Sequence, residues 1–162
     1  YVMEKFDVMT GGDVGTKINN DEMLSNATTE EEAWENIINA FNIEMPQFFY
    51  WPSGFEYENC SVDIEAQTAI IQYVKDVDIV HLVVISNTQN ASFLASRDSG
   101  KTIEEIASQL MEGLNVKLWE VLDEGDEKPT YILQWEYKNV YYELSGKTSK
   151  EDMENIAKNI MY

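Results

Sequence analysis

The single histidine, His81, is the first residue to consider for catalysis, because a Ser–His–Asp or Cys–His arrangement would have to use it. It lies within an apolar run, Ile79–Ile85, that has the composition of a β-strand. The sequence contains no G-x-S-x-G, H-E-x-x-H, P-loop or G-x-G-x-x-G motif. Since no nucleophile motif accompanies the histidine, the pattern favours a hydrogen-bonded structural residue over a general base.

Cys60 is the only cysteine, so the chain can form no internal disulfide and no cysteine-based zinc site. Its neighbours Tyr57, Val62 and Ile64 indicate a half-buried strand position. Because nothing basic nearby would lower the pKa of the thiol, we expect a packed, inert side chain rather than a reactive one.

Composition leaves paired-carboxylate catalysis open, since the chain has 30 Asp and Glu residues. Such catalysis needs two acids whose surroundings push their pKa values apart, usually in an apolar cleft. Most acids here lie at predicted helix starts or in turns, where water solvates them. We therefore predict that the protein is not an enzyme and name no catalytic residue. A carboxylate-based hydrolase is the alternative.

The acidic stretch Asp123–Glu127 could offer oxygen ligands to Ca²⁺, which prefers six to eight of them. Its spacing does not match an EF-hand loop, and Lys128-Pro129 after it is ordinary turn chemistry. The sequence predicts a solvated hairpin tip, no metal ligand and no cofactor, with a calcium-assisted site as the alternative.

Aromatic residues form the other candidate surface, in two groups. The first group surrounds Pro52-Ser53-Gly54 and the second lies on later predicted strands; the members are Phe48, Phe49, Tyr50, Trp51 and Phe55, then Trp119, Tyr131, Trp135, Tyr137, Tyr141 and Tyr142. Aromatics on strands usually form core and cross-strand pairs. If some line a concave sheet, they could bind an apolar ligand or a partner peptide, and periodicity does not separate these cases.

Three segments begin like helices, with a hydroxyl side chain, an acid three residues later and then an apolar stripe. The hydroxyl accepts from a free backbone N–H group, and the acid favours the positive end of the helix dipole. The pattern predicts three capped helices, over residues 29–42, 102–112 and 149–161.

Seven further segments are rich in aromatic and β-branched residues and predict strands: Phe48–Trp51, Phe55–Ser61, Ala69–Lys75, Val77–Ser86, Val116–Leu122, Tyr131–Tyr137 and Val140–Leu144. Short turns at Lys75-Asp76, 123–129 and Lys138-Asn139 would join neighbours into antiparallel hairpins. Strands occur in blocks with helices outside them, so we predict an α+β fold: an antiparallel sheet of about six or seven strands with the three helices packed against it. The strand that contains His81 is apolar on both alternations otherwise, which predicts a central place in the sheet.

The 162 residues suit one domain, with 44% hydrophobic content to build its core. Residues 1–28 are rich in Gly and Asn and read as a flexible lead-in or tether, which leaves residues 29–162 as a single α+β domain. A net charge of −19 repels phosphate backbones and anionic lipids, which argues against a nucleic-acid partner. The longest apolar run is far shorter than the roughly 18 residues that span a bilayer.

The stretch Gln134–Gly146 is followed by a Ser149-Lys150-Glu151-Asp152 cap and the segment Ile156-Ala157-Lys158-Asn159-Ile160. This ending resembles a family of bacterial domains of unknown function, found mostly in Gram-positive organisms at the C-terminal end of membrane-anchored proteins. Its members end approximately in Trp-x-x-Asn-Gly-x-Tyr-Tyr-x-Leu-x-Gly. Upstream, Tyr50–Phe55 is similar to the family's Pro-x-Gly-Phe entry, so the resemblance covers roughly residues 46–162. Lys138-Asn139 replaces Asn-Gly here, and Asn tolerates the left-handed turn conformation.

The resemblance implies an extracytoplasmic domain tethered to the cell membrane, and some relatives also carry an anti-sigma-factor-like cytoplasmic region. Its motif residues are structural, so it transfers no catalytic role. We expect a binding, sensory or interaction domain whose partner is a protein, an envelope component or a small apolar ligand. The chain begins at Tyr1 rather than Met, and we expect membrane contact only through an N-terminal anchor outside this sequence.

Overall fold

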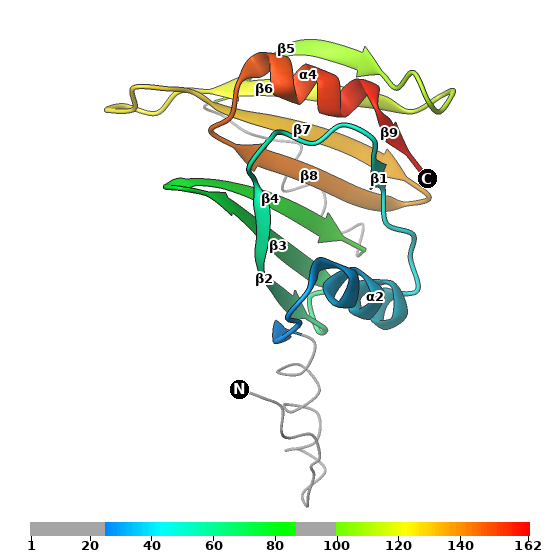
Figure 1. Ribbon diagram of the computed structural model, residues 1–162. Coiled ribbons are helices and arrows are strands. Elements are labelled where there is room, and N and C mark those ends of the chain that lie inside the picture. The colour runs from blue at the N-terminus through cyan, green and yellow to red at the C-terminus, as the bar shows by residue number, and fades with distance from the viewer. Residues whose placement is uncertain (1–24, 87–99) are drawn as a thin grey trace, which may run out of the picture.

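Seven strands pair into one antiparallel sheet, in the order β2-β3-β4-β8-β7-β6-β5 (Figure 1). The computed structural model describes residues 25–86 and 100–162. The strands are β2 Glu56–Asp63, β3 Thr68–Lys75, β4 Asp78–Ile85, β5 Gly100–Ala107, β6 Asn115–Val121, β7 Thr130–Tyr137 and β8 Val140–Gly146. Consecutive strands form two meanders, β2 to β4 and β5 to β8, and the pairing of β4 with β8 joins them into one sheet.

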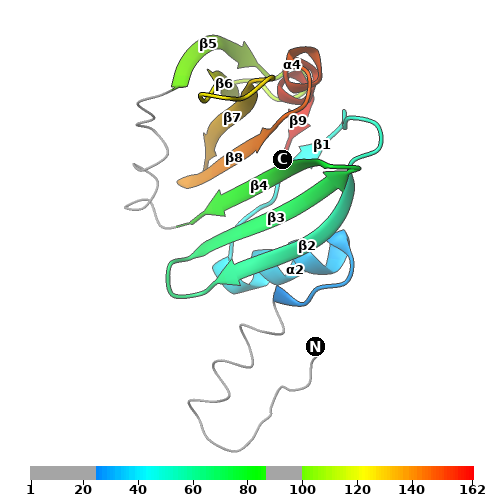
Figure 2. The same ribbon diagram turned by 90° about the vertical axis from the view of Figure 1, so that its left-hand side faces the viewer.

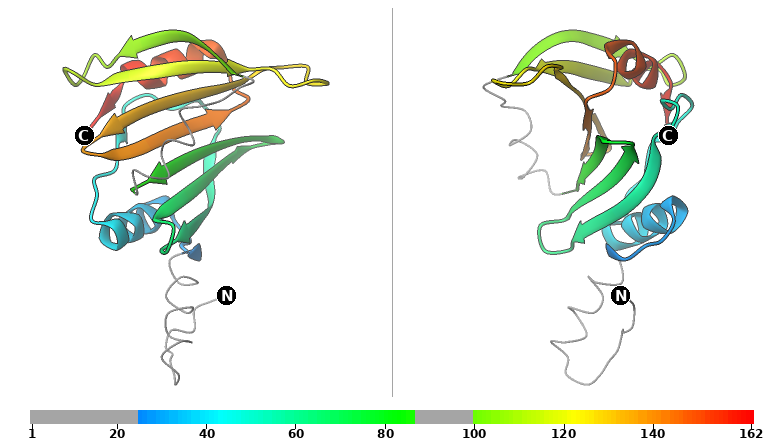
Figure 3. Two further views of the ribbon diagram at one scale, coloured as in Figure 1. Left: turned by 180° about the vertical axis from the view of Figure 1, so that it is seen from behind. Right: turned by 60° about the vertical axis from the view of Figure 1, so that its left-hand side comes forward.

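Two described helices, α2 (Glu30–Phe41) and α4 (Lys150–Lys158), cover the same face of this sheet (Figures 2 and 3). Both helices begin at the predicted N-cap residues. The side chain of Thr29 accepts from the N–H of Glu32, and that of Ser149 accepts from the N–H of Asp152. Two short strands, β1 (Gln47–Phe48) and β9 (Ile160–Met161), pair antiparallel beside the helices. Neither described helix has the length and apolar composition needed to cross a membrane.

The core lies between the helices and the sheet. One row of directly opposed, fully buried side chains crosses the sheet from β3 to β6: Ile71, Leu82, Leu144, Leu133 and Leu118. Ala33 and Ile37 of α2 cover one end of the face, and Met153 and Ile156 of α4 cover the other. Burying such side chains contributes about 1.5–3 kcal/mol each, so this row alone is a substantial part of the stability.

The predicted α+β class and antiparallel sheet of about six or seven strands are confirmed, and β4 is a central strand as expected. The predicted strand Phe48–Trp51 is wrong, because only Gln47–Phe48 is extended and it pairs with β9 outside this sheet. The predicted helix 102–112 is wrong, because Gly100–Ala107 forms the edge strand β5 and pairs with β6. Its apolar spacing was ambiguous, and pairing through Ile106 opposite Val116 outweighs a weak local helix preference. The predicted helix 149–161 ends at Lys158, after which Ile160–Met161 forms β9.

The predicted hairpins joining β3 to β4, β6 to β7 and β7 to β8 are all present. Lys138 and Asn139 both have positive φ, at 50° and 65°, as a two-residue type I′ turn requires. Asp76, at φ 55°, begins the turn before β4.

Residues 1–24 of the predicted lead-in lie outside the described residues. Where the described chain begins, it lies against the outer strand β2. The Ser25 hydroxyl accepts from the N–H of Val62, and the Tyr57 hydroxyl donates to the carbonyl of Ala27 at 2.7 Å. Ala27 itself is buried.

Candidate functional site

A groove of about 620 Å³ opens between α2, β1 and the outer strands β2 and β3. Such a volume falls within the range of small-ligand sites. Six of its lining residues are aromatic and three are polar: Trp34, Phe48, Trp51, Phe55, Tyr57 and Tyr73, with Glu30, Gln47 and Glu56. The fold therefore gathers aromatic rings from five separate segments at one place.

The fold brings each ring to the groove for a local reason. Trp34 belongs to the sheet-facing stripe of α2, one residue after the buried Ala33. Tyr57 and Tyr73 are cross-strand partners on β2 and β3. Gly54 adopts φ 91°, which few side chains tolerate, and this turn returns Phe55 to the groove beside Trp51.

The rings contact one another edge to face or at a tilt. The centroids of Trp51 and Tyr73 are 4.7 Å apart at 60°, and those of Phe48 and Trp51 are 5.5 Å apart at 40°. Trp34 meets Phe48 at 6.3 Å and 76°. These are favourable aromatic geometries, so the groove wall is a packed, preorganised surface.

The hydroxyl group of Tyr73 and the indole N–H groups of Trp34 and Trp51 already form hydrogen bonds within the fold. The Tyr73 hydroxyl donates to Oε2 of Glu30 at 2.5 Å and accepts from Nε1 of Trp34 at 3.3 Å. Nε1 of Trp51 donates to the carbonyl of Phe55 at 2.9 Å. The groove therefore offers ring faces rather than hydroxyl or indole N–H groups to a ligand.

Burial and nearby acids keep both groove tyrosines protonated. Burial raises the pKa of Tyr73, and the Glu30 carboxylate raises it further. Burial likewise raises the pKa of Tyr57 to about 12. Neither phenol can act as a general base near neutral pH.

Exposure divides the groove into floor, wall and rim. Tyr73 is 2% exposed and Phe55 is 7% exposed, so they form the floor. Trp34, Phe48, Trp51 and Tyr57 are half-buried and form the wall. The side chains of Glu30 and Glu56 are exposed at the rim.

Only three of the five residues in the first predicted aromatic group line the groove. Phe48, Trp51 and Phe55 line the groove, whereas Phe49 is 61% exposed and the Tyr50 hydroxyl donates to Asp152 at 2.5 Å. Trp34, Tyr57 and Tyr73 were missed as site residues. Only the placement of α2 over β2 and β3 brings them together, and no local pattern signals that placement.

Two residues of the second aromatic group, Trp135 and Tyr142, are buried in the core, and the other four are half-buried. Trp135 stacks on Tyr142 with centroids 5.7 Å apart, and its Nε1 donates to the Tyr162 hydroxyl. The Tyr142 hydroxyl donates to the carbonyl of Glu44. A Cβ on Gly146 would lie 2.7 Å from the carbonyl oxygen of Ile79, so only glycine fits where β8 meets β4.

His81 is a bonded strand residue, as the sequence indicated. Its Nε2 lies 2.8 Å from Oε1 of Gln72 on β3, and Gln72 in turn donates to Glu58. Cys60 is 3% exposed, and burial raises the pKa of its thiol to about 12. The predicted packed thiol is therefore confirmed, and neither residue lines the groove.

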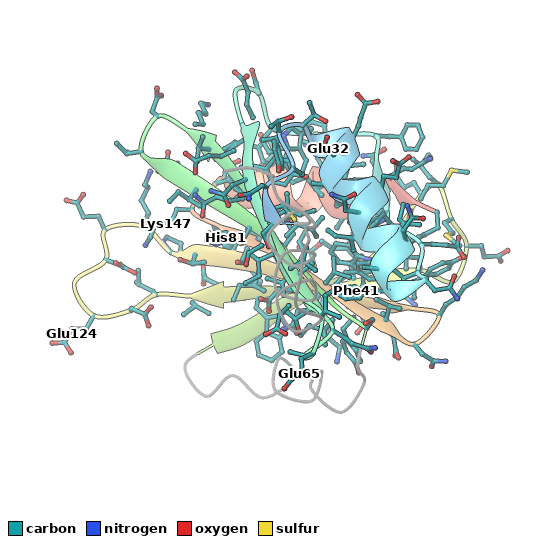
Figure 4. All side chains as sticks on the ribbon, turned by 90° about the horizontal axis from the view of Figure 1, so that it is seen from below. Glu32, Phe41, Glu65, His81, Glu124 and Lys147 are labelled. Atoms are coloured by element: carbon teal, nitrogen blue, oxygen red, sulfur yellow. The ribbon has the colours of Figure 1, made fainter. Side chains whose placement is uncertain are left out.

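The acidic stretch Asp123–Glu127 forms the loop between β6 and β7, where Figure 4 shows Glu124 pointing outward at the tip. Asp126 pairs with Lys147 at 2.9 Å, and its N–H donates to the carbonyl of Asp123. Within residues 25–86 and 100–162, no three His, Cys, Asp or Glu side chains cluster closely enough to hold a metal ion.

A pair of carboxyl groups on β5 and α4 interacts directly. A hydrogen bond with Glu154 of α4 raises the pKa of Glu104 on β5. β5 is the edge strand opposite β2, so this pair lies at the other end of the sheet from the groove. The pair is partly exposed to water and lines no part of the groove.

Comparison with known proteins gives one match. The family described as "Domain of unknown function (DUF4367)" matches residues 45–160 of the chain. No curated protein and no solved structure matches the chain significantly. The family match confirms the expected resemblance to a family of domains of unknown function, and it spans the groove residues from Gln47 to Tyr73.

Proposed function

The chain belongs to DUF4367, a family of domains of unknown function, and we propose from the geometry of its groove that it is a non-enzymatic binding domain. The ligand lies on the aromatic wall formed by Trp34, Phe48 and Trp51. The observation that carries the proposal is a groove of about 620 Å³ whose four wall rings are half-buried rather than closed into the core.

The arrangement of titratable groups supports binding over catalysis. An enzyme needs at least two converging side chains with shifted pKa values in a cleft. The groups with raised pKa in the groove are Tyr57 and Tyr73, which stay protonated. The carboxyl pair Glu104–Glu154 lies at the opposite sheet edge and lines no part of the groove.

The location of the domain is part of the same proposal. The resemblance described above supports an extracytoplasmic position in a membrane-anchored bacterial protein, with the groove available to ligands or partners outside the cell. Fusing the full-length gene to a reporter that is active only outside the cytoplasm tests this location. A reporter signal confined to the cytoplasm would overturn it.

Occupancy of the groove can be measured through the indole N–H signals of the four tryptophans in an ¹⁵N-labelled sample. Trp34 and Trp51 line the groove, whereas Trp119 lies on β6 and serves as an internal reference. A fragment set of neutral and charged compounds should contain members that shift the Trp34 and Trp51 signals but not that of Trp119. If no compound shifts either groove signal at millimolar concentration, the binding proposal fails.

A further inference from the structure

We propose that the occupant of the groove is a basic segment of a partner protein, with an arginine or lysine side chain seated against the aromatic wall. This inference rests on the proposed binding function and specifies the chemistry of the ligand. Three features of the groove support it: its charge, its ring faces and its shape.

The lining residues carry two negative charges and no positive one, from Glu30 and Glu56. Glu30 is held in place by the 2.5 Å bond from Tyr73, which still leaves its other oxygen atom for a ligand. Glu56 makes no hydrogen bond or ion pair with any residue that the structure describes, so its carboxylate is free to pair with a cation. The chain's net charge of −19 adds a long-range attraction for basic partners.

The ring faces suit a cation as well as an apolar group. The negative face of Trp or Tyr attracts ammonium and guanidinium groups within about 6 Å of the ring centroid. The chain already shows this chemistry at the groove, because Nζ of Lys75 lies 5.9 Å from the centroid of the Phe55 ring. The polar tips of Trp34, Trp51 and Tyr73 are bonded internally, so these three groups do not compete with a ligand for the ring faces.

The shape favours a peptide over a single small cation. One guanidinium group would fill only part of about 620 Å³, and the remaining space suits the neighbouring residues of a chain. The groove is also bordered by Glu56 and Tyr57 at the start of β2, which is an outer strand of the sheet. Ser25 and Ala27 already contact this strand at Val62 and Tyr57. The extended segment therefore lies along the first residues of β2, where its basic side chain enters the aromatic wall.

The test uses two blocked pentapeptides, Gly-Gly-Arg-Gly-Gly and the same peptide with neutral citrulline in place of arginine. Each is titrated into the ¹⁵N-labelled domain while the Trp34 and Trp51 signals are followed. We expect the arginine peptide to bind about tenfold more tightly, the ratio that corresponds to a desolvated cation–π contact with a nearby carboxylate. Its affinity should fall with added salt, whereas that of the citrulline peptide should not.

Two double variants separate a local effect from the overall charge. Glu30→Gln with Glu56→Gln removes both rim charges, and the amide oxygen introduced at position 30 can still accept from the Tyr73 hydroxyl. Glu65→Gln with Glu136→Gln removes two exposed charges away from the groove. The two double variants therefore have the same net charge. We expect the first pair to abolish the preference for arginine over citrulline and the second pair to retain it, with melting curves confirming that both variants fold.

The outcomes distinguish this inference from the proposed function. If citrulline and arginine peptides shift the groove signals with equal affinity, the domain binds there but the cation is not what it recognises, and the inference falls. Equal weakening by both double variants would place the attraction in the overall charge and overturn the inference. If neither peptide shifts Trp34 or Trp51 while neutral fragments do, the inference falls and the binding function stands.

Discussion

The hydroxyl of Tyr73, on the floor of the groove, donates to the carboxylate of Glu30 on the rim at 2.5 Å. The two residues lie 43 positions apart, and their bond fixes the first turn of α2 against β3. Because the same hydroxyl accepts from Trp34, it orients one carboxylate and one indole ring at once. The geometry of the groove therefore depends on a single buried phenol.

Removing this hydroxyl should destabilise the fold without emptying the core. Tyr73→Phe keeps the ring and loses two hydrogen bonds, so we expect the free energy of unfolding to fall by about 1–2 kcal/mol in urea denaturation. Tyr141→Phe is the matched control, because the half-buried Tyr141 makes no hydrogen bond with the described residues. Equal losses in both variants would contradict the role given to Tyr73.

The buried tyrosines make the fold sensitive to alkali. Burial raises the pKa of Tyr57 and of Tyr142 to about 12, above the ordinary value of 10.0. The folded protein then holds protons that the unfolded chain releases, so the stability these phenols contribute is complete below about pH 10 and is lost as the pH rises toward 12. Unfolding free energies between pH 8 and pH 11.5, together with tyrosinate absorbance, check this prediction; titration of all nine tyrosines near pH 10 in the folded protein would contradict it.

The Glu104–Glu154 pair predicts a variant that gains stability at neutral pH but not in acid. The folded-state pKa of Glu104 is raised, so the stability from its protonated form is present at low pH and lost as the pH rises through that pKa. Glu104→Gln removes the repulsion and should stabilise the protein by about a few tenths of a kcal/mol at pH 7, with no gain near pH 4. Thermal melts at both values test it.

The neighbouring variant Glu105→Gln is the control for this effect. Glu105 is exposed and lies opposite Lys117 rather than a second acid. We expect no stabilisation at pH 7 from this change. A gain as large as that of Glu104→Gln would show that net charge, rather than the carboxyl pair, sets the effect.

The turn between β7 and β8 offers a stabilising substitution. Asn139 has φ 65°, a conformation that glycine adopts without steric cost. Asn139→Gly should raise the free energy of unfolding by about 0.5 kcal/mol. Asn115→Gly, at the extended start of β6, should instead lower it, and loss of stability in both would contradict the turn assignment.

The sequence predicted those parts of the fold whose signals are local. The Thr29 and Ser149 caps, the strand alternation and the Lys138-Asn139 turn each depend on neighbouring residues, and each is present. Residues 102–112 failed because their apolar spacing suits a helix as well as a strand, and the choice between them depends on the partner strand β6. Periodicity contains no information about partners.

The groove could not be predicted for the same reason. Its rings come from α2, β1, the loop before β2, β2 itself and β3, and their positions along the chain have no shared pattern. Phe48, Trp51 and Phe55 were recognised as an aromatic group, but Phe49 and Tyr50 within that group point elsewhere. Only the packing of α2 against the outer strands converts scattered aromatics into one surface.

The antiparallel pairing of β4 with β8, which joins the two meanders, has a consequence for the kinetics of folding. All other ladders of the main sheet connect strands that follow one another along the chain, whereas Val80 pairs with Gly146 and Ile85 with Tyr141. Each meander can form from contacts between neighbouring strands. Pairing β4 with β8 brings together residues that are far apart in the chain, at a larger cost in conformational entropy. We therefore expect the pairing of β4 with β8 to limit the folding rate. Until these strands pair, their apolar edges remain open to pairing with other chains.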